Sequence, residues 1–324
     1  MMKRMVFAAP GGPEALIPET VPIPEPGPLQ VVVENAAIGV NYRDILYRSG
    51  AYAVSTPSGI GEEGAGIVVK VGDNVDGFRP GDRVAYAFAG RQAYAEFVAL
   101  DEACVFHRPA DVSPDLAAAV FFKGMTAYYL THKAWTVSEN SVVFVNAASG
   151  GVGGAIVRFA KKLGAKVIGQ VGSPGKVEFA AVAGCDHVLR GDPAEVIDRV
   201  RELTSGRGVD AVYDAVGLAA KDTALGVLAE RAIWIHYGTV SGPITNFDFA
   251  SLAKHGSLYV TRPTSSTYLA SRAQRKEAAE AVWGVIEAGA FDGLSQLTLP
   301  LAEAPRVHAI LEKRLALGPA ILKP

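Results

Sequence analysis

Apolar and polar positions along residues 142–260 predict parallel strands separated by helices. Residues 142–145 form a continuous apolar run, as expected of a parallel strand buried on both faces. Apolar side chains then recur at helical spacing through 156–163, and Gly164 is placed to end that helix. Later apolar runs predict strands at 166–171, 187–189, 210–213, 232–236 and 258–260. This alternation predicts a doubly wound α/β domain with a parallel six-stranded sheet.

A glycine-rich turn joins the first of these strands to its helix. It reads Ala148-Ser149-Gly150-Gly151-Val152-Gly153, and such a turn lets the backbone approach a pyrophosphate whose charge meets a helix N-terminus. Ala148 stands where the strict G-x-G-x-x-G pattern begins with Gly, so the flanking strand and helix carry the interpretation. Residues 142–171 therefore predict a dinucleotide-binding βαβ unit. The alternative is an ordinary glycine turn in an α/β domain.

The chain on either side of this segment has a different composition and a different pattern of apolar residues. Residues 18–28 are rich in proline and predict an extended connection rather than a central strand or a helix. Short β-like runs predict a compact, largely β domain before the glycine turn, at 31–34, 67–71 and 83–87. Beyond it we expect helices at 275–288 and 303–315 and a short apolar end at 320–322, which folds back on the N-terminal domain. We therefore expect one domain from 1–122 with 263–324 and a nucleotide-binding domain at 123–262.

Size and charge narrow the functional class. A chain of 324 residues exceeds the usual size of one core, which favours two domains. A formal net charge of -2, without a run of Lys or Arg, argues against an electrostatically driven nucleic-acid binder. The apolar stretch ending at Pro10 is too short for a signal-peptide core, and no apolar run approaches membrane-spanning length. We expect a soluble, cytoplasmic protein in which Cys104 and Cys185 are reduced structural thiols.

The end of the second predicted strand indicates which nicotinamide cofactor binds. NAD sites usually place an acidic residue about 20 residues past the glycines, but this strand runs into Gly172-Ser173-Pro174-Gly175-Lys176, and no acid follows before Glu178. A 2′-phosphate would meet the Ser173 hydroxyl, Lys176 and a helix N-terminus, with Arg190 after the next strand as a further candidate. The sequence thus predicts NADPH. The alternative for Lys176 is a solvated lysine in the first turn of a helix.

Motifs spread over nearly the whole chain carry a family resemblance. They are GGPE at 11–14, GVNYRD at 39–44, YRSGAY at 47–52, GEEGAGIVVKVG at 61–72, GDRVAYA at 81–87, FKGMTAYYL at 122–130, AASGGVG at 147–153, YDAVG at 213–217 and GSLYVTRP at 256–263. With these motifs the chain resembles the zinc-free, ζ-crystallin-like quinone oxidoreductases of the medium-chain dehydrogenase/reductase superfamily. The resemblance implies a GroES-like N-terminal domain, a Rossmann domain, a cofactor in the cleft between them and a homodimer.

The same superfamily contains zinc enzymes, but this chain lacks zinc ligands at two of the corresponding positions. In the zinc enzymes of this superfamily, a Cys precedes the Asp of the segment that reads Asn41-Tyr42-Arg43-Asp44 in this chain. Those enzymes also have a His where this chain has Glu62. An amide and a carboxylate in place of a thiolate and an imidazole make a poor tetrahedral site. Two cysteines also exclude a four-cysteine structural zinc. The sequence predicts no metal.

The candidate catalytic residues stabilise charge rather than transfer protons. Hydride transfer to a conjugated acceptor builds negative charge on a carbonyl oxygen, which hydrogen-bond donors stabilise. Asn41 and Tyr52 match positions that line the active cleft of the resembling enzymes, with Arg43 as a possible cationic partner. The alternatives are that Asn41 only caps a loop and that Tyr52 only packs. The family often has a further Tyr where this chain has Leu46, so a tyrosine role stays open.

The remaining site residues follow from the glycine turn and from the resemblance. The turn supplies Ser149, Gly150, Gly151, Val152 and Gly153 for the pyrophosphate. The resemblance places Thr126, Tyr129, Gly238 and Thr239 near the nicotinamide and the cofactor backbone, Arg314 at the 2′-phosphate, and Lys123 and Arg262 in supporting positions. At Gly191 the family often has a Tyr, so this detail of the phosphate site departs from its pattern.

Three functions are compatible with these residues. The leading hypothesis is a metal-free, NADPH-dependent quinone reductase. A second is an NADPH-dependent reductase of the C=C bond in an enal, enone or enoyl thioester, because NYRD-type loops resemble those of enoyl reductases too. A third is an NADPH-binding structural or RNA-binding protein, which the weak net charge disfavours.

Overall fold

The computed structural model describes residues 1–324 and divides them into two compact units. The first comprises residues 1–123 and 294–324, and the second comprises 124–293. The second border lies 31 residues beyond the expected 262/263. The reason is helix α9 (Arg272–Glu287), which belongs to the second unit: Arg158 Nε donates to Ala290 O (2.6 Å) and Lys162 Nζ to Gly284 O (2.5 Å).

The first unit is built mainly of β-structure, as predicted. Its strands are β1 Met2–Phe7, β2 Ile17–Val21, β3 Gln30–Val40, β4 Ser58–Gly59, β5 Glu63–Val71, β6 Arg83–Ala87, β7 Phe97–Asp101, β8 Val105–His107, β15 Leu297–Pro300 and β16 Ala320–Lys323. One sheet has the order β2-β1-β4, and the other has the order β15-β16-β3-β5-β6-β8, with β7 also paired to β3. The helices of this unit are α1 Tyr42–Arg48, α10 Ala304–Glu312 and the first part of α2 Pro114–Tyr129. Single 3-10 turns occupy 13–15, 102–104 and 301–303.

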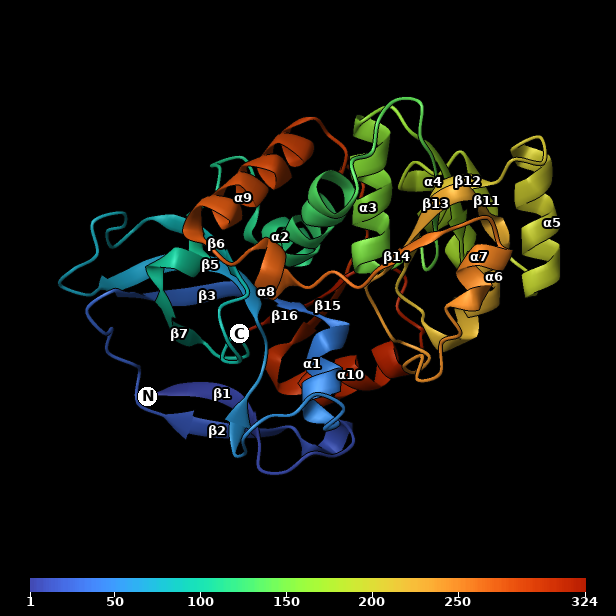
Figure 1. The fold of residues 1–324 in the computed structure, drawn as a ribbon. Helices are drawn as coiled ribbons and strands as arrows, with labels where there is room; N and C mark the ends of the chain where they lie inside the picture. The colour runs from blue at the N-terminus through green and yellow to red at the C-terminus, as the bar shows by residue number, and fades with distance from the viewer. The chain divides into compact units, whose positions relative to one another are not determined.

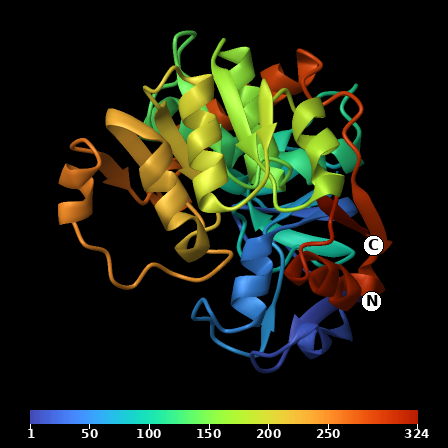
Figure 2. The same cartoon turned by 90° about the vertical axis from the view of Figure 1, so that its right-hand side faces the viewer.

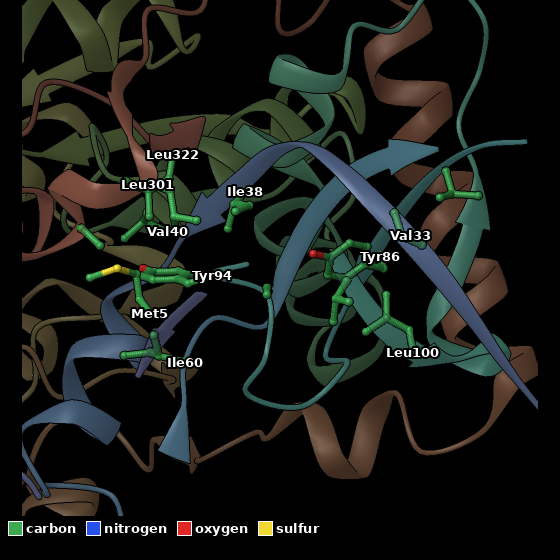
Figure 3. Close-up of a cluster of buried hydrophobic side chains, with 14 of the residues drawn as sticks. Met5, Val33, Ile38, Val40, Ile60, Tyr86, Tyr94, Leu100, Leu301 and Leu322 are labelled. Atoms are coloured by element: carbon green, nitrogen blue, oxygen red, sulfur yellow. The ribbon is translucent and has the colours of Figure 1, made fainter. Parts of the chain in front are cut away.

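The apolar core of the first unit lies between these sheets and α10. Met5, Ile60 and Tyr94 group together on one side of β3, and Tyr86 and Leu100 lie further along it (Figure 3). All of them are at most 3% exposed. The core of this unit is therefore built from side chains that lie far apart in the sequence.

The chain ends confirm one expectation and refine another. β16 pairs antiparallel with β3, for example Ile321 with Gly39, so the apolar tail folds back on the N-terminal domain as predicted. The proline-rich stretch 18–28 is not wholly a connection, because its first residues belong to β2, where Pro18 pairs with Met5. β2 is an edge strand, the position in a sheet that tolerates proline because one of its sides needs no hydrogen bonds.

The second unit is a parallel sheet covered by helices. Its strands are β9 Val142–Val145, β10 Lys166–Gln170, β11 His187–Leu189, β12 Val209–Asp214, β13 Leu228–His236 and β14 Tyr259–Thr261. The strands pair in parallel in the order β11-β10-β9-β12-β13-β14, with β14 at the outer edge (Figure 2). The six-stranded sheet was predicted, and its strand order reverses between β9 and β12, which is the ligand-binding position in such sheets.

The helices of the second unit lie on both faces of this sheet. They are α3 Gly151–Lys162, α4 Val177–Val182, α5 Pro193–Leu203, α6 Lys221–Val227, α7 Ala250–Lys254, α8 Ser265–Tyr268 and α9. A π-helical turn covers 130–134, and 3-10 turns cover 174–176 and 218–220. Helix α3 lies on one face, and α5 and α6 lie on the other (Figure 1). Asp192 and Glu195 form a capping box at the start of α5. No helix has both the length and the apolar character needed to cross a membrane.

Candidate nucleotide and substrate site

The glycine turn has the geometry of a pyrophosphate cradle. Gly150 is the N-cap of α3 and has extended backbone angles (φ -78°, ψ 169°). Because glycine has no side chain, no side-chain hydrogen bond caps this end of the helix. The N-terminal amides of α3 are therefore open to an anion. A Cβ on Gly153 would lie 2.3 Å from Ala147 O, so only glycine permits this approach of helix to turn. Ser149, Gly151 and Val152 complete the same turn, and the residues present fit a dinucleotide.

The predicted 2′-phosphate residues follow neighbouring strands of the sheet. Ser173 follows β10 and is the N-cap of the 3-10 turn Pro174–Lys176, without a side-chain capping bond. Arg190 follows β11, which pairs with β10. Because parallel strands end at one edge of a sheet, the structure brings Ser173, Lys176 and Arg190 to a common edge. The helix N-terminus expected here differs slightly: the 3-10 turn comes first, and Lys176 is the N-cap of α4.

The structure also explains why glycine stands at 191. The backbone of Gly191 has φ +144°, and a Cβ there would lie 2.3 Å from Glu195 Oε2. Glu195 Oε2 is held in the capping box of α5 by the amide of Asp192. A tyrosine at 191 would have a strained backbone conformation, and its Cβ would clash with that carboxylate unless the carboxylate moved. The local backbone therefore explains why this chain has Gly where the family often has Tyr.

The residues assigned to the nicotinamide side lie in the second unit. Thr126 and Tyr129 are 7% and 4% exposed on α2, and the Tyr129 ring stacks on Tyr268 at 5.3 Å. Gly238 and Thr239 follow β13, and a Cβ on Gly238 would lie 2.5 Å from Ala215 O. The turns after β12 and β13 thus approach each other closely, as do helix and turn at Gly153.

Asn41 is held by a buried ion pair in the first unit. Asn41 is the N-cap of α1 and 6% exposed, and its Nδ2 donates to Glu63 Oε2 (2.9 Å). Glu63 also accepts from Lys123 Nζ (2.6 Å) and from the Phe122 amide (2.6 Å). One amide hydrogen of Asn41 is therefore bound to a carboxylate, which fixes the direction of the other. Sequence reasoning gave Lys123 a supporting position but passed over Glu63.

Arg43 and Tyr52 meet around Tyr47. Arg43 donates to Tyr47 Oη (2.8 Å) and lies 3.1 Å from Glu62 Oε2. Burial lowers the pKa of Arg43, but Glu62 and Tyr47 more than offset this and leave that pKa raised. Burial raises the pKa of Glu62, and Arg43 and Arg91 oppose the shift. The Tyr52 ring packs edge-on against Tyr47 at 5.5 Å. Tyr47, which opens the YRSGAY motif but was given no role from the sequence, is thus the residue that joins these two candidates.

Asp44 is a further feature that sequence reasoning missed. It is fully buried, and its Oδ2 accepts from the Asn41 amide (2.8 Å) and from Tyr94 Oη (3.2 Å). Burial, with a smaller contribution from Glu62, raises the pKa of Asp44 to about 8. Its place in the GVNYRD motif beside Asn41 was the available signal. Asp44 supports the start of α1 and thereby the backbone of Asn41.

The structure places two further predicted residues and shows no metal-ligand cluster. Arg262 Nη1 donates to His236 O (3.1 Å), which agrees with a supporting position. Arg314 is an exposed residue just after α10 in the first unit, with φ +57°. No group of three or more His, Cys, Asp or Glu side chains is arranged to hold a metal ion. The candidates therefore fall into two sets, with Asn41, Arg43, Tyr52, Lys123 and Arg314 in the first unit and the others in the second.

Comparisons with known proteins cover the full chain. Two family descriptions match: an alcohol dehydrogenase GroES-like domain over residues 27–141 and a zinc-binding dehydrogenase over 151–282. A quinone oxidoreductase of Pseudomonas aeruginosa is 40% identical over 100% of both chains. A 2-haloacrylate reductase of a Burkholderia species is 34% identical over 100% of this chain and 99% of its own. The crystal structure of Escherichia coli quinone oxidoreductase complexed with NADPH has a TM-score of 0.94 at 37% identity, covering 99% of this chain and 100% of that one.

Proposed function

Because the chain belongs to the quinone oxidoreductases of the medium-chain dehydrogenase/reductase superfamily, we propose that it is a metal-free NADPH:quinone oxidoreductase. The observation that carries the proposal is the edge of the six-stranded sheet. At this edge, the N-terminus of α3 follows the glycine turn and is open. Ser173 and Lys176 follow β10 with no acidic residue between the strand and Lys176, and Arg190 follows β11. This set suits a pyrophosphate and a 2′-phosphate.

The chain's own residues would hold the cofactor in a defined order. Ser149, Gly150, Gly151, Val152 and Gly153 would bind the pyrophosphate through the amides that open the N-terminus of α3. Thr126, Tyr129, Gly238 and Thr239 would line the nicotinamide and the adjoining cofactor backbone. Ser173, Lys176, Arg190 and Arg314 would bind the 2′-phosphate. When bound, NADPH supplies a hydride.

Asn41 is proposed to stabilise the acceptor. Glu63 holds one hydrogen of its amide, so the other is oriented before the substrate arrives and costs no reorganisation when negative charge develops on a carbonyl oxygen. Arg43 supplies positive charge beside it, and Tyr52 supplies a hydroxyl on a ring packed against Tyr47. None of these groups needs to be a strong acid or base, which suits reduction of a quinone whose oxygens take protons from water.

Reduction of an activated C=C bond is the alternative function. The full-length match to a 2-haloacrylate reductase favours it, because that name describes reduction of an alkene conjugated to a carboxylate. Asn41 and Arg43 would stabilise an enolate oxygen as readily as a quinone oxygen.

One assay separates the two functions. NADPH oxidation is followed at 340 nm, roughly the nicotinamide absorbance maximum, with 1,4-benzoquinone and with a crotonyl thioester under the same conditions. We expect turnover with the quinone. Turnover with the thioester alone would overturn the proposal and leave the enoyl reductase in its place.

We further propose a cytoplasmic homodimer. β14 is an edge strand, and its Tyr259 and Val260 are 63% and 39% exposed. An exposed apolar edge is stabilised by pairing with another strand, and a second copy of β14 would supply it with two-fold symmetry. Both Cys104 and Cys185 are free thiols, as suits a reducing compartment.

A further inference from the structure

Asp214 is the last residue of β12 and is fully buried. In the sheet β12 lies between β9, which leads into the glycine turn, and β13, which leads into Gly238 and Thr239. Asp214 therefore lies where the strand order reverses, beneath the turns proposed to bind NADPH.

Five hydrogen bonds converge on the Asp214 carboxylate. Oδ1 accepts from Asn146 Nδ2 (2.5 Å) and from the amides of Val216 (2.8 Å) and Gly217 (3.1 Å). Oδ2 accepts from Trp234 Nε1 (3.1 Å) and lies 3.1 Å from His236 Nδ1. A carboxylate only accepts, so every partner faces it as a donor. Its hydrogen-bonding capacity is filled entirely by groups of this unit.

These donors come from three segments: the turn after β9, the turn after β12, and strand β13, which carries Trp234 and His236. Asn146 directly follows β9, and its Oδ1 accepts from the Ala215 amide (2.8 Å), so the turns after β9 and β12 are joined in both directions. The backbone carbonyl of Asp214 accepts from the amides of Tyr237 (2.8 Å) and Gly238 (3.1 Å). One residue thus links the turn that would hold the pyrophosphate to the turn that would face the nicotinamide.

We propose that Asp214 is a positioning residue for NADPH, which holds the glycine turn and the 237–239 turn in the binding geometry before the cofactor arrives. Turns that must be ordered during binding reduce the affinity by the cost of that ordering. The proposal rests on the cofactor half of the proposed function and is independent of the acceptor. A purely structural Asp214 would instead affect folding stability and leave the affinity of the folded protein unchanged.

The test measures NADPH binding directly: the intact protein is titrated with NADPH, and the fluorescence of the cofactor is followed. Asp214→Asn has the same size, but its NH2 group must face donors on one side or the other. We expect the Kd for NADPH to rise roughly tenfold to hundredfold, as for loss of hydrogen bonds to a charged group. The KM for NADPH should rise with it, while kcat at saturating NADPH changes less.

Asp210→Asn is the matched control. Asp210 lies near the amino end of the same strand, where its Oδ2 accepts from the Val142 amide (2.8 Å) and its Oδ1 pairs with Arg207. It joins β12 to β9 as Asp214 does, but at the opposite edge of the sheet. Asp210→Asn should lower the melting temperature and leave the Kd within about twofold of wild type. An equal loss of affinity in Asp210→Asn and Asp214→Asn would overturn the proposal.

Two more variants keep the test decisive if Asp214→Asn folds poorly. Asn146→Ala leaves Asp214 four donors and removes only the link to the glycine turn, so it should raise the Kd by itself. The exchange Asn146→Asp with Asp214→Asn restores an amide facing a carboxylate, and its Kd should lie closer to wild type than that of Asn146→Asp alone. A folded Asn146→Ala protein with wild-type affinity would overturn the proposal.

The outcomes separate this inference from the proposed function. If the wild-type protein binds NADPH and reduces no quinone, the proposed activity fails and the role of Asp214 is judged on Kd alone. If the wild-type protein does not bind NADPH, both fail. If binding is tight in wild type and unchanged in folded Asp214→Asn and Asn146→Ala, only the role of Asp214 fails.

Discussion

The 2′-phosphate is the group by which NADPH differs from NADH, so the residues proposed to bind it can be tested singly. Lys176→Ala and Arg314→Ala should each raise the Kd for NADPH roughly tenfold or more, the loss of a charge-assisted hydrogen bond. The Kd for NADH should change little, because NADH lacks the phosphate. Binding is measured with both cofactors by fluorescence.

Arg199→Ala provides the control for this pair. Arg199 is an exposed arginine of α5 paired with Glu202, and its removal should alter neither Kd. Equal losses for NADPH and NADH in the Lys176 and Arg314 variants would refute the phosphate assignment.

Gly153 and Gly175 form a second residue-scale test, since both lie in the proposed cofactor region. Gly153→Ala would place a Cβ 2.3 Å from a backbone carbonyl, whereas a Cβ on Gly175 meets nothing within 4 Å. We expect Gly153→Ala to weaken NADPH binding and to lower the free energy of unfolding by about 1–3 kcal/mol, as overpacking does. Gly175→Ala should leave both near wild type. Titration with NADPH and urea unfolding measure the two effects, and tolerance of alanine at 153 would contradict the close approach.

Asp44 predicts a pH dependence of folding. Its pKa is about 8 in the folded protein and about 4 in an unfolded chain. The folded state therefore favours the protonated carboxyl: its stabilising contribution is complete below about pH 4 and is lost as the pH rises toward 8, at about 1.4 kcal/mol per unit of pKa difference. Asp44→Asn should remove this part of the slope when urea unfolding is measured from pH 5 to 8. The exposed Asp222→Asn serves as control, and an unchanged slope in Asp44→Asn would count against the argument.

At the scale of elements, periodicity predicted the second unit well because each strand and helix there is a local pattern. The strand predicted at 187–189 matches the structure to the residue. The length of β13 was underestimated: it begins at Leu228, ahead of the expected Ala232, and includes exposed Glu230 and Arg231. Polar residues obscured the pattern there, and only pairing with β12 shows the longer strand.

The edge strand β14 carries the prediction for assembly. Val260→Asp should place a charge on the exposed edge of the sheet and convert the proposed dimer to a monomer. Leu218→Asp, a change at a 53% exposed leucine outside the strands, should leave the dimer intact. Light scattering coupled to size exclusion gives the mass of each, and a Val260→Asp protein that keeps the wild-type dimer mass would move the interface elsewhere.

At the scale of the whole molecule, the proposed chemistry needs no metal ion. Where the zinc enzymes have ligands, Asn41 binds Glu63 and Glu62 pairs with Arg43. Prolonged dialysis against a chelator should therefore leave quinone reduction by NADPH unchanged. Activity that falls on chelation and returns with zinc would overturn the metal-free assignment.

Local sequence patterns were enough to predict the fold class, the nucleotide-binding turn and the preference for NADPH. Each of these depends on neighbours in the chain: an apolar run, a glycine turn, and a strand end without an acidic residue. The sequence also pointed to Asn41 and Arg43, through a motif of six residues.

The partners that hold those residues in place could be identified only from the three-dimensional fold. Glu63 reaches Asn41 across 22 positions of the chain, and Asp214 reaches Asn146 across 68. Such partners meet because strands pair, and strand pairing leaves no local signal at either residue. The same reason explains the domain border beyond α9, which depends on contacts between α9 and α3 rather than on the composition of residues near 263.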